Sequence, residues 1–225
     1  GGSKQATHFG RQALAWAREV CFKGQAEVDL EFPGEKIGYS NSGRLLAYVH
    51  VGGDNVNVRL VREGWSPCFE KFGLPRIHRP TMADAELRAK LEGRGIWGGL
   101  GGRGDYAALK TYWSMRAGQV EGFRSALTMA DDLLCVRSDC DNILARAKAG
   151  ATATIFADVS RAYDIADGSM LVQLGSPQFG LCAHFPLAAR ALGAFVEREF
   201  LGPFKPNYLY FTGPLSMAGQ QPQMA

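Results

Sequence analysis

A glycine-rich stretch, GGLGGRG at residues 98–104, is the feature that most constrains how this chain can fold. Glycines offer no side chains to bury, so such a stretch cannot pack into a hydrophobic core and is expected at a boundary between packed parts. A chain of 225 residues has the length of one large domain or two small ones. The sequence therefore predicts a first domain at 1–98, a glycine-rich linker and helical connector at 99–149, and a second domain at 150–225.

The first domain is predicted to mix helices and strands. Apolar residues recur every three or four positions in its helical segments and every second position in its first strand. The predicted elements are a helix at 12–21, a half-buried strand at 26–32, a strand buried on both faces at 45–51, a short helix at 57–64, and a helix capped by Thr81 at 81–92.

After residue 104, the pattern of apolar residues changes from helical spacing to the alternation typical of strands. Residues 105–149 look helical, and from Ala153 to Val159 apolar residues alternate with period two. The predicted elements that follow are strands at 170–174, 180–185 and 208–212, with a helix at 187–200 before the last of them. Strand, hairpin, strand, helix, strand is the order of a small Greek-key barrel such as an OB-fold.

Composition excludes several classes of protein. No apolar run approaches the roughly 18–20 residues of a membrane helix, which predicts a soluble globular chain without a membrane span. The five cysteines are an odd number and include no CxxC pair, so neither a disulfide framework nor a zinc site is expected. Residues 1–104 carry 15 Lys and Arg against 11 Asp and Glu, a surplus that permits a phosphate-rich partner but equally fits an ordinary surface.

Familiar catalytic motifs are absent or lack their context. The glycines match GxGxxG, but they follow a helix and a Trp rather than a strand, so a dinucleotide site is rejected. The histidines form no HExxH pair, and His50 is expected to be structural. The carboxylates of Glu27, Asp29 and Glu31 share one strand face that alternation turns to solvent. No metal site is predicted from this chain.

Four blocks in the first hundred residues resemble the staphylococcal-nuclease-like (thermonuclease) family. They are HFGRQALAW at 8–16, SGRLLAYVHV at 42–51, NVNVRLVREGWSP at 55–67, and AELRAKLEGRGIWG at 85–98, in the family's order. Residues from 112 onwards more loosely resemble the C-terminal extension of some bacterial members. The resemblance implies a β-rich α+β chain: a partial nuclease-type OB barrel with helices, a helical connector and a second small OB-like barrel. It leaves the cellular location open, with an exported or periplasmic location possible.

The resemblance also implies a reaction. In this family a calcium ion held by aspartates polarises the phosphodiester, a glutamate acts on water, and two arginines neutralise developing charge. Arg44 matches the second of these arginines and is the predicted catalytic residue. The other groups lie before the HFGRQAL block in the family, and only seven residues precede His8 here. The calcium ligands and the base are therefore expected on a missing upstream segment, and a protein partner or separate segment could complete the barrel. The loop before Arg44 also departs from the family, which puts a substrate contact by Tyr39 in doubt.

Aromatic residues after the short helix supply the predicted substrate-binding residues Phe69, Lys71 and Phe72. Aromatic faces stack bases and an adjacent lysine can hold phosphate; alternatively these rings, with Trp65, cap the core. The predicted function is the C-terminal portion of a nuclease hydrolysing DNA or RNA, and the alternative is a non-catalytic nucleic-acid-binding or protein-scaffolding module. The second barrel offers a set of aromatic residues suited either to weak nucleic-acid binding or to a structural role: Phe179, Phe185, Tyr208, Tyr210 and Phe211.

Overall fold

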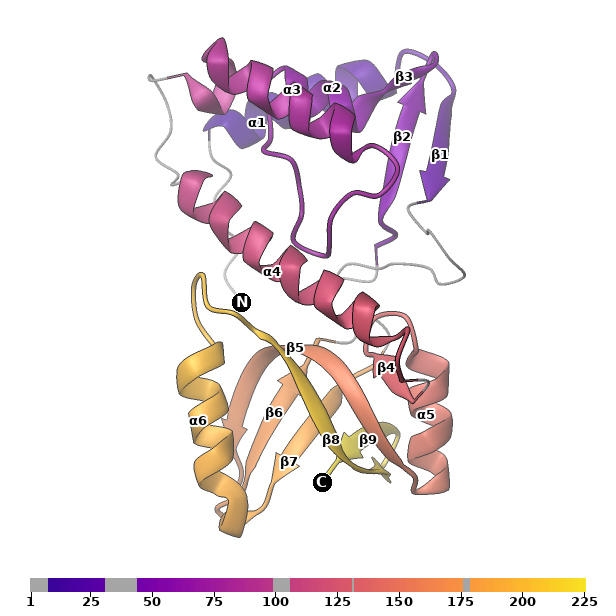
Figure 1. The fold of residues 1–225 in the computed structure, drawn as a ribbon, viewed down its shortest axis with the longest axis vertical. Helices are drawn as coiled ribbons and strands as arrows, with labels where there is room; N and C mark the ends of the chain where they lie inside the picture. Colours follow the sequence, from indigo (N-terminus) through magenta and orange to yellow (C-terminus); the bar gives the residue numbers. More distant parts are fainter. Residues whose placement is uncertain (1–7, 31–43, 99–105, 131, 176–178) are drawn as a thin grey trace. The chain divides into compact units, whose positions relative to one another are not determined.

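A computed structural model describes residues 8–30, 44–98, 106–130, 132–175 and 179–225 (Figure 1). It divides into two compact units, one of residues 1–35 and 46–114 and the other of residues 36–45 and 115–225. The division falls within a single long helix, α4 (Tyr106–Ala126). The glycine-rich residues 99–104 lie outside the described part, and the three-segment division made from sequence remains a prediction.

The N-terminal unit combines a small antiparallel sheet with helices. Its strands pair in the order β1–β2–β3, with Ala26 opposite Val51 and Leu30 opposite Ala47. The elements are α1 (His8–Cys21), β1 (Ala26–Leu30), β2 (Ala47–Val51), β3 (Asp54–Asn55), α2 (Val56–Arg62), α3 (Arg79–Leu91), the 3-10 helix η1 (Gly95–Trp97) and the start of α4.

One face of this sheet packs against α2 and α3. The core of the unit consists of Tyr48, Val58, Val61, Cys68, Met82 and Ala85. Asn55 caps α2 by accepting a 3.0 Å hydrogen bond from the Val58 N–H, which satisfies a backbone donor that the helix leaves free. The buried sides of α2 and α3 therefore pack against Tyr48 of β2.

Two predictions about the burial of these strands are wrong. The strand predicted as half-buried is exposed at all five positions of β1, including Val28 at 55%. In β2, predicted as buried on both faces, only Tyr48 is buried. The physical reason is that no described element covers the face that carries Val28. In addition, α3 begins at Arg79 rather than Thr81, with Pro80 in its first turn, where the fixed φ of proline suits a helix start.

The C-terminal unit is built around a second, larger sheet. Its elements are the rest of α4, β4 (Leu133–Cys135), α5 (Cys140–Ala149), β5 (Thr152–Asp164), β6 (Met170–Leu174), β7 (Leu181–Phe185), the 3-10 helix η2 (Leu187–Ala189), α6 (Arg190–Phe200), β8 (Tyr208–Ala218) and β9 (Gln221–Met224).

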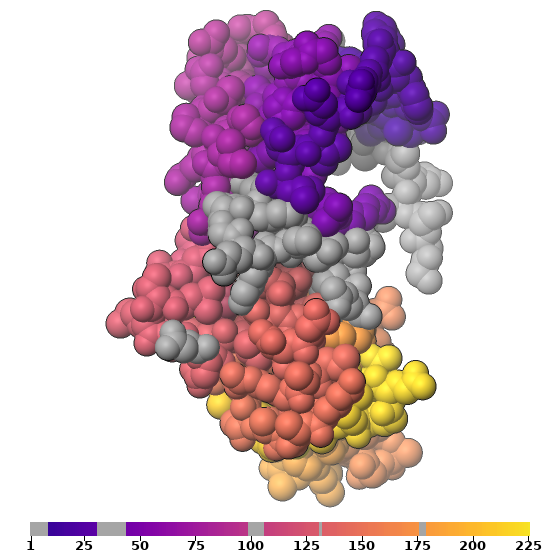
Figure 2. Space-filling model, turned by 90° about the vertical axis from the view of Figure 1, so that its right-hand side faces the viewer, coloured from indigo at the N-terminus to yellow at the C-terminus, as the bar shows by residue number. Residues whose placement is uncertain are grey.

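Five of these strands close into a barrel. The order is β5–β6–β7–β9–β8, and β5 also pairs with β8, while β7 and β9 run parallel. The yellow C-terminal residues accordingly lie against the orange residues of the same unit in the space-filling view (Figure 2). With the helix α6 between the third and fourth barrel strands, this is an OB-like topology. The predicted mixed α+β fold with an OB-like barrel is confirmed.

A buried polar network joins the C-terminal part of α4 to the barrel. Arg116, which is fully buried, lies 3.4 Å from Asp158 Oδ2 and donates to the Asn207 side chain. The second oxygen of Asp158 accepts a 2.6 Å hydrogen bond from Arg137. The Arg116 guanidinium also lies 4.3 Å from the centre of the Tyr208 ring, and burial raises the pKa of the Tyr208 hydroxyl. Two arginines therefore share one carboxylate inside this unit.

None of the described helices is both long enough and apolar enough to cross a membrane.

Candidate nucleic-acid interface

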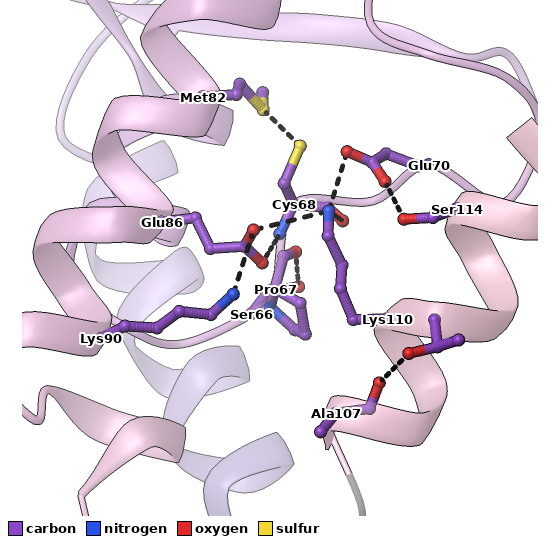
Figure 3. Close-up of polar contacts among 11 residues, drawn as sticks. Ser66, Pro67, Cys68, Glu70, Met82, Glu86, Lys90, Ala107, Lys110 and Ser114 are labelled. Atoms are coloured by element: carbon purple, nitrogen blue, oxygen red, sulfur yellow. Dashed lines mark hydrogen bonds and ion pairs between the residues drawn. The ribbon is translucent and has the colours of Figure 1, made fainter.

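The segment between α2 and α3 carries the predicted substrate-binding residues, and its backbone is held on both sides of Cys68. The Glu86 carboxylate of α3 accepts a 3.1 Å hydrogen bond from the Cys68 N–H. Lys110 of α4 donates a 3.1 Å hydrogen bond from Nζ to the Cys68 carbonyl oxygen (Figure 3). The peptide groups on both sides of Cys68 are therefore held, which fixes the direction in which the next side chain, Phe69, leaves the backbone.

The clamp is electrically balanced. Lys110 Nζ lies 2.8 Å from Glu70 Oε1 and 3.5 Å from Glu86 Oε2, and Lys90 Nζ is also 3.5 Å from Glu86 Oε2. Ser114 adds a 3.0 Å hydrogen bond to the other oxygen of Glu70 (Figure 3). Two ammonium groups thus face two carboxylates, so this largely buried set carries no net charge and is suited to support rather than to bind an ion.

Phe69 is the centre of an exposed aromatic cluster, here called the Phe69 cluster: Phe69, Phe72 and Trp113, with Lys71. The Phe69 ring is 47% exposed. Its centroid lies 4.8 Å from that of Trp113 and 5.6 Å from that of Phe72, both edge-to-face. Lys71 Nζ lies 5.6 Å from the centre of the Phe72 ring. The structure therefore brings together the three residues predicted to contact substrate.

Trp113 is the member of the cluster that sequence reasoning missed. It comes from α4, more than forty residues beyond Phe69, and nothing in the local sequence links the two. Trp65, in contrast, donates a 3.2 Å hydrogen bond from Nε1 to Glu63 and is not part of the cluster.

Arg44, the predicted catalytic residue, is exposed and lies three positions before β2. It falls in the other compact unit and is not a member of the Phe69 cluster. Tyr39 lies outside the described residues.

Asp29 and His50 form a separate polar pair on neighbouring strands of the N-terminal unit. Asp29 Oδ2 lies 3.0 Å from His50 Nε2, without the geometry of a hydrogen bond, and the His78 ring centroid lies 6.0 Å from that of His50. Glu27 and Asp29 face solvent, as predicted, while Glu31 lies outside the described residues. Within the described ranges, no three His, Cys, Asp or Glu side chains gather as a metal site requires.

The aromatics of the second barrel mostly serve its packing. Phe185, Tyr208 and Phe211 are buried and Phe179 packs against the core. The Phe123, Phe156 and Tyr208 rings form a parallel stack with centroid separations of 4.5 and 4.8 Å. Only Tyr210, 48% exposed, is available to a ligand. Of the two roles left open for these residues, the structural one therefore accounts for most of them.

The Phe69 cluster has the properties of a base-stacking surface. Its central residue, Phe69, is exposed, the rings of Phe72 and Trp113 pack against it edge-to-face, and Lys71 lies over the Phe72 ring. Such rings stack bases irrespective of sequence, and a neighbouring cation holds the phosphate. An exposed ring with supporting rings and a nearby cation is the arrangement that base stacking requires.

Comparison with known proteins places the first part of the chain in a family. Residues 2–99 match the family of staphylococcal nuclease homologues. No curated protein matches the chain. The matched segment contains Arg44 and three of the four residues of the Phe69 cluster, and it ends before α4 and Trp113.

Proposed function

Since residues 2–99 form a domain of the staphylococcal-nuclease-like family, we propose that the chain is part of a phosphodiesterase that hydrolyses DNA or RNA. The observation that carries the proposal is the exposed Phe69 ring, which the Glu86–Lys110 clamp holds in a fixed direction. A rigid ring loses little conformational freedom when a base stacks on it.

Each predicted residue has a role in this proposal. The Phe69 cluster stacks bases of the bound strand, and Lys71 attracts their phosphates. Arg44 binds a non-bridging phosphate oxygen pair, for which the planar guanidinium is suited because it donates two parallel hydrogen bonds and stays charged.

A calcium ion is implied by the family, and the described residues do not fit one. They contain no cluster of three acidic, His or Cys side chains that could hold it. In the proposed enzyme the calcium ligands and the general base would come from residues other than those described.

Nuclease activity is the first test. We expect the protein, as a full-length chain, to cleave single-stranded DNA or RNA in the presence of calcium and to lose this activity in chelator. Arg44→Ala is expected to lower the rate of cleavage, whereas Arg11→Ala, an exposed arginine on α1, serves as the control. If the protein cleaves neither substrate, with calcium or with chelator, the proposed nuclease activity is contradicted.

Binding at the Phe69 cluster is tested separately from cleavage. With chelator present, Phe69→Ala is expected to weaken binding of a labelled single-stranded oligonucleotide by at least about fivefold, since stacking contributes roughly 1–3 kcal/mol per base. Phe22→Ala is the matched control, because Phe22 is an exposed phenylalanine of the same unit, at 85%. Equal affinities in both variants would contradict the assigned role of Phe69.

A non-catalytic module is the second candidate, and one observation favours it. The acidic residues close to the Phe69 cluster already have structural partners, since Glu70 and Glu86 both pair with Lys110. Such a module binds nucleic acid, or scaffolds a protein partner, without cleaving. It predicts that Phe69→Ala weakens oligonucleotide binding while calcium has no effect on the integrity of the oligonucleotide.

A further inference from the structure

The outward side of α3 carries a row of apolar residues, here called the α3 stripe: Ala83, Leu87 and Leu91. Each is four residues from the next, so the three lie on one side of the helix. Leu87 is 55% exposed and Leu91 77%, and Ala83 is exposed as well. The other side of α3, which lies beside α2 (Figure 1), buries Met82 and Ala85 in the core of the unit. The helix is therefore apolar on two sides, and its own unit covers only one of them.

The charged residues around the α3 stripe are balanced. Residues 79–92 hold as many cations as anions, namely Arg79, Arg88 and Lys90 against Asp84, Glu86 and Glu92. Nucleic acid and anionic lipid surfaces attract segments with an excess of cations, and this helix has none. The balance instead fits a partner surface that is apolar in its centre and carries charges of both signs beside it.

One ion pair runs along the edge of the α3 stripe. Asp84 and Arg88 lie on the same flank of Leu87, and Arg88 Nε is 2.9 Å from Asp84 Oδ2. Both side chains are more than half exposed, at 58% and 64%. An exposed pair of this kind contributes little to the stability of its own helix. Its two charges can therefore pair with those of a second molecule at little cost.

A second copy of α3, packed antiparallel on the first, matches this surface. A twofold axis at Leu87 sets the two Leu87 side chains against each other and brings the same flank of both helices together. Asp84 lies three residues before Leu87 and Arg88 one residue after it, so Asp84 of one copy and Arg88 of the other are offset by only about 3 Å along the helices. In a parallel pair the twofold axis runs along the helices and carries this flank to the opposite side, which separates the two charges. The charge pattern is therefore self-complementary in the antiparallel arrangement.

From these observations we infer that the α3 stripe is a self-association surface, at which two copies of this chain form an antiparallel helix pair. Leu87 and Leu91 of both copies are buried in the contact, and Asp84 of each copy pairs with Arg88 of the other. The helix has only 13 residues, which places the interface at the small end of specific interfaces. The dimer therefore forms as the protein concentration rises. The α3 stripe shares no residue with the Phe69 cluster, and the inference does not rest on nuclease activity.

The test measures the mass of the full chain in solution by analytical ultracentrifugation over a series of protein concentrations. The mass is expected to rise from that of one chain, 24.4 kDa, towards twice that value. Leu87→Glu should raise the Kd of the dimer at least about tenfold, because it removes a buried leucine from both sides of the contact. Leu14→Glu is the matched control, since Leu14 is a leucine of α1 with a similar exposure of 53%, and it should leave the Kd unchanged.

Charge reversal tests the antiparallel arrangement itself. Asp84→Arg sets like charges against each other across the axis and is expected to raise the Kd at least about fivefold. The double variant Asp84→Arg/Arg88→Asp restores opposite signs and should return the Kd to nearly that of the parent. The matched control is Glu19→Arg, which breaks an equally exposed pair with Lys23 on α1 and should not change the Kd. Urea unfolding of each variant separates a lost contact from a lost fold.

Four results would overturn the inference. The parent protein could keep the mass of one chain at every concentration, or its dimer could persist unchanged in Leu87→Glu, which would place the contact on another surface. The controls Leu14→Glu and Glu19→Arg could weaken the dimer as much as the variants of α3 do. Finally, the double variant could fail to restore the dimer while folding as stably as the parent, which would exclude the pairing of Asp84 with Arg88 of the other copy.

Discussion

At the scale of single residues, the exposed position of Phe69 depends on polar groups that lie behind it. Glu86 and Lys110 bind the N–H and the carbonyl of the preceding residue, Cys68. Both charged groups are largely buried and each has an opposite charge within 3.5 Å. A buried donor that loses its acceptor costs more than an average hydrogen bond contributes. The clamp is therefore the place where one substitution disturbs stability and binding together.

Glu86→Ala is expected to destabilise the protein by about 1–3 kcal/mol, because the buried Cys68 N–H loses its acceptor. It should also weaken oligonucleotide binding, since the Phe69 ring is no longer held. Urea unfolding followed by tryptophan fluorescence measures the first effect. Glu92→Ala removes a more exposed glutamate that pairs with Arg94, and an equal loss of stability in this control would contradict the clamp.

A second single-residue prediction concerns pH. The pKa of Asp167 is lowered below its ordinary value, chiefly because the Ser169 hydroxyl and then the Ser169 N–H donate to its carboxylate. A carboxyl with a lowered pKa contributes stability that is complete above its unfolded pKa of about 3.9 and is lost as the pH falls through the folded value.

NMR titration of the Asp167 carboxyl should therefore give a midpoint below the ordinary one in the parent protein. Ser169→Ala removes the first of these donors, so the midpoint should move upward. An unchanged midpoint in Ser169→Ala would show that the hydroxyl does not set this pKa.

At the scale of elements, the turn after α2 and the turn after α3 meet at two glycines. Gly64 and Gly95 both have positive φ, at 75° and 51°, and the Gly64 carbonyl accepts a 2.9 Å hydrogen bond from the Ile96 N–H. A Cβ on Gly95 would lie 2.2 Å from the Gly64 carbonyl oxygen. That atom belongs to the backbone and cannot swing away, so the close approach itself requires glycine.

Gly95→Ala should consequently cost more than the left-handed backbone alone. Gly52 is the matched control, since its φ is 59° and a Cβ there meets nothing within 4 Å. Gly52→Ala is expected to destabilise by roughly 1–2 kcal/mol and Gly95→Ala by clearly more, as measured by urea unfolding. Equal losses would mean that the two turns separate without cost.

A helix or strand could be predicted from the sequence where its pattern of apolar residues lies within the element itself. The alternation from Ala153 to Val159 predicted the first part of β5 (Thr152–Asp164) correctly, because apolar residues at every second position indicate a strand. The short strands β4 and β9, at residues 133–135 and 221–224, were not predicted, since their pairing with distant strands decides them. The register shift in β5 between Val159 and Arg161 could not be predicted either, because it is defined only by the pairing of β5 with β6.

The candidate site shows the same limit. Phe69, Lys71 and Phe72 could be named from sequence because they lie within four consecutive positions after a short helix. Trp113, which supports Phe69, could not, since the contact joins segments far apart in the chain. The apolar face of β1 was wrongly predicted as buried, because alternation identifies a face but does not say whether anything covers it.

At the scale of the whole molecule, the two units have separate hydrophobic cores, and the tryptophans lie in only one of them. All four tryptophans, Trp16, Trp65, Trp97 and Trp113, lie in the N-terminal unit. The larger core, with residues such as Ile155, Val172 and Leu181, lies in the C-terminal unit. Tryptophan fluorescence therefore follows the unfolding of one unit, and circular dichroism follows both.

Asp158→Ala uses this separation. The substitution leaves the guanidinium groups of Arg116 and Arg137 buried without the carboxylate that they share, and removing one partner of a buried ion pair costs about 3–5 kcal/mol. The circular dichroism transition of the C-terminal unit should move to lower urea concentration, while the tryptophan transition stays in place. The control Asp164→Ala breaks an exposed pair with Arg190 and should cost at most about 1 kcal/mol. If the tryptophan transition of Asp158→Ala also moved to lower urea concentration, the expectation would be contradicted. The two units would then unfold in one cooperative transition, because a loss of stability in the C-terminal core would change the fluorescence of tryptophans in the N-terminal unit.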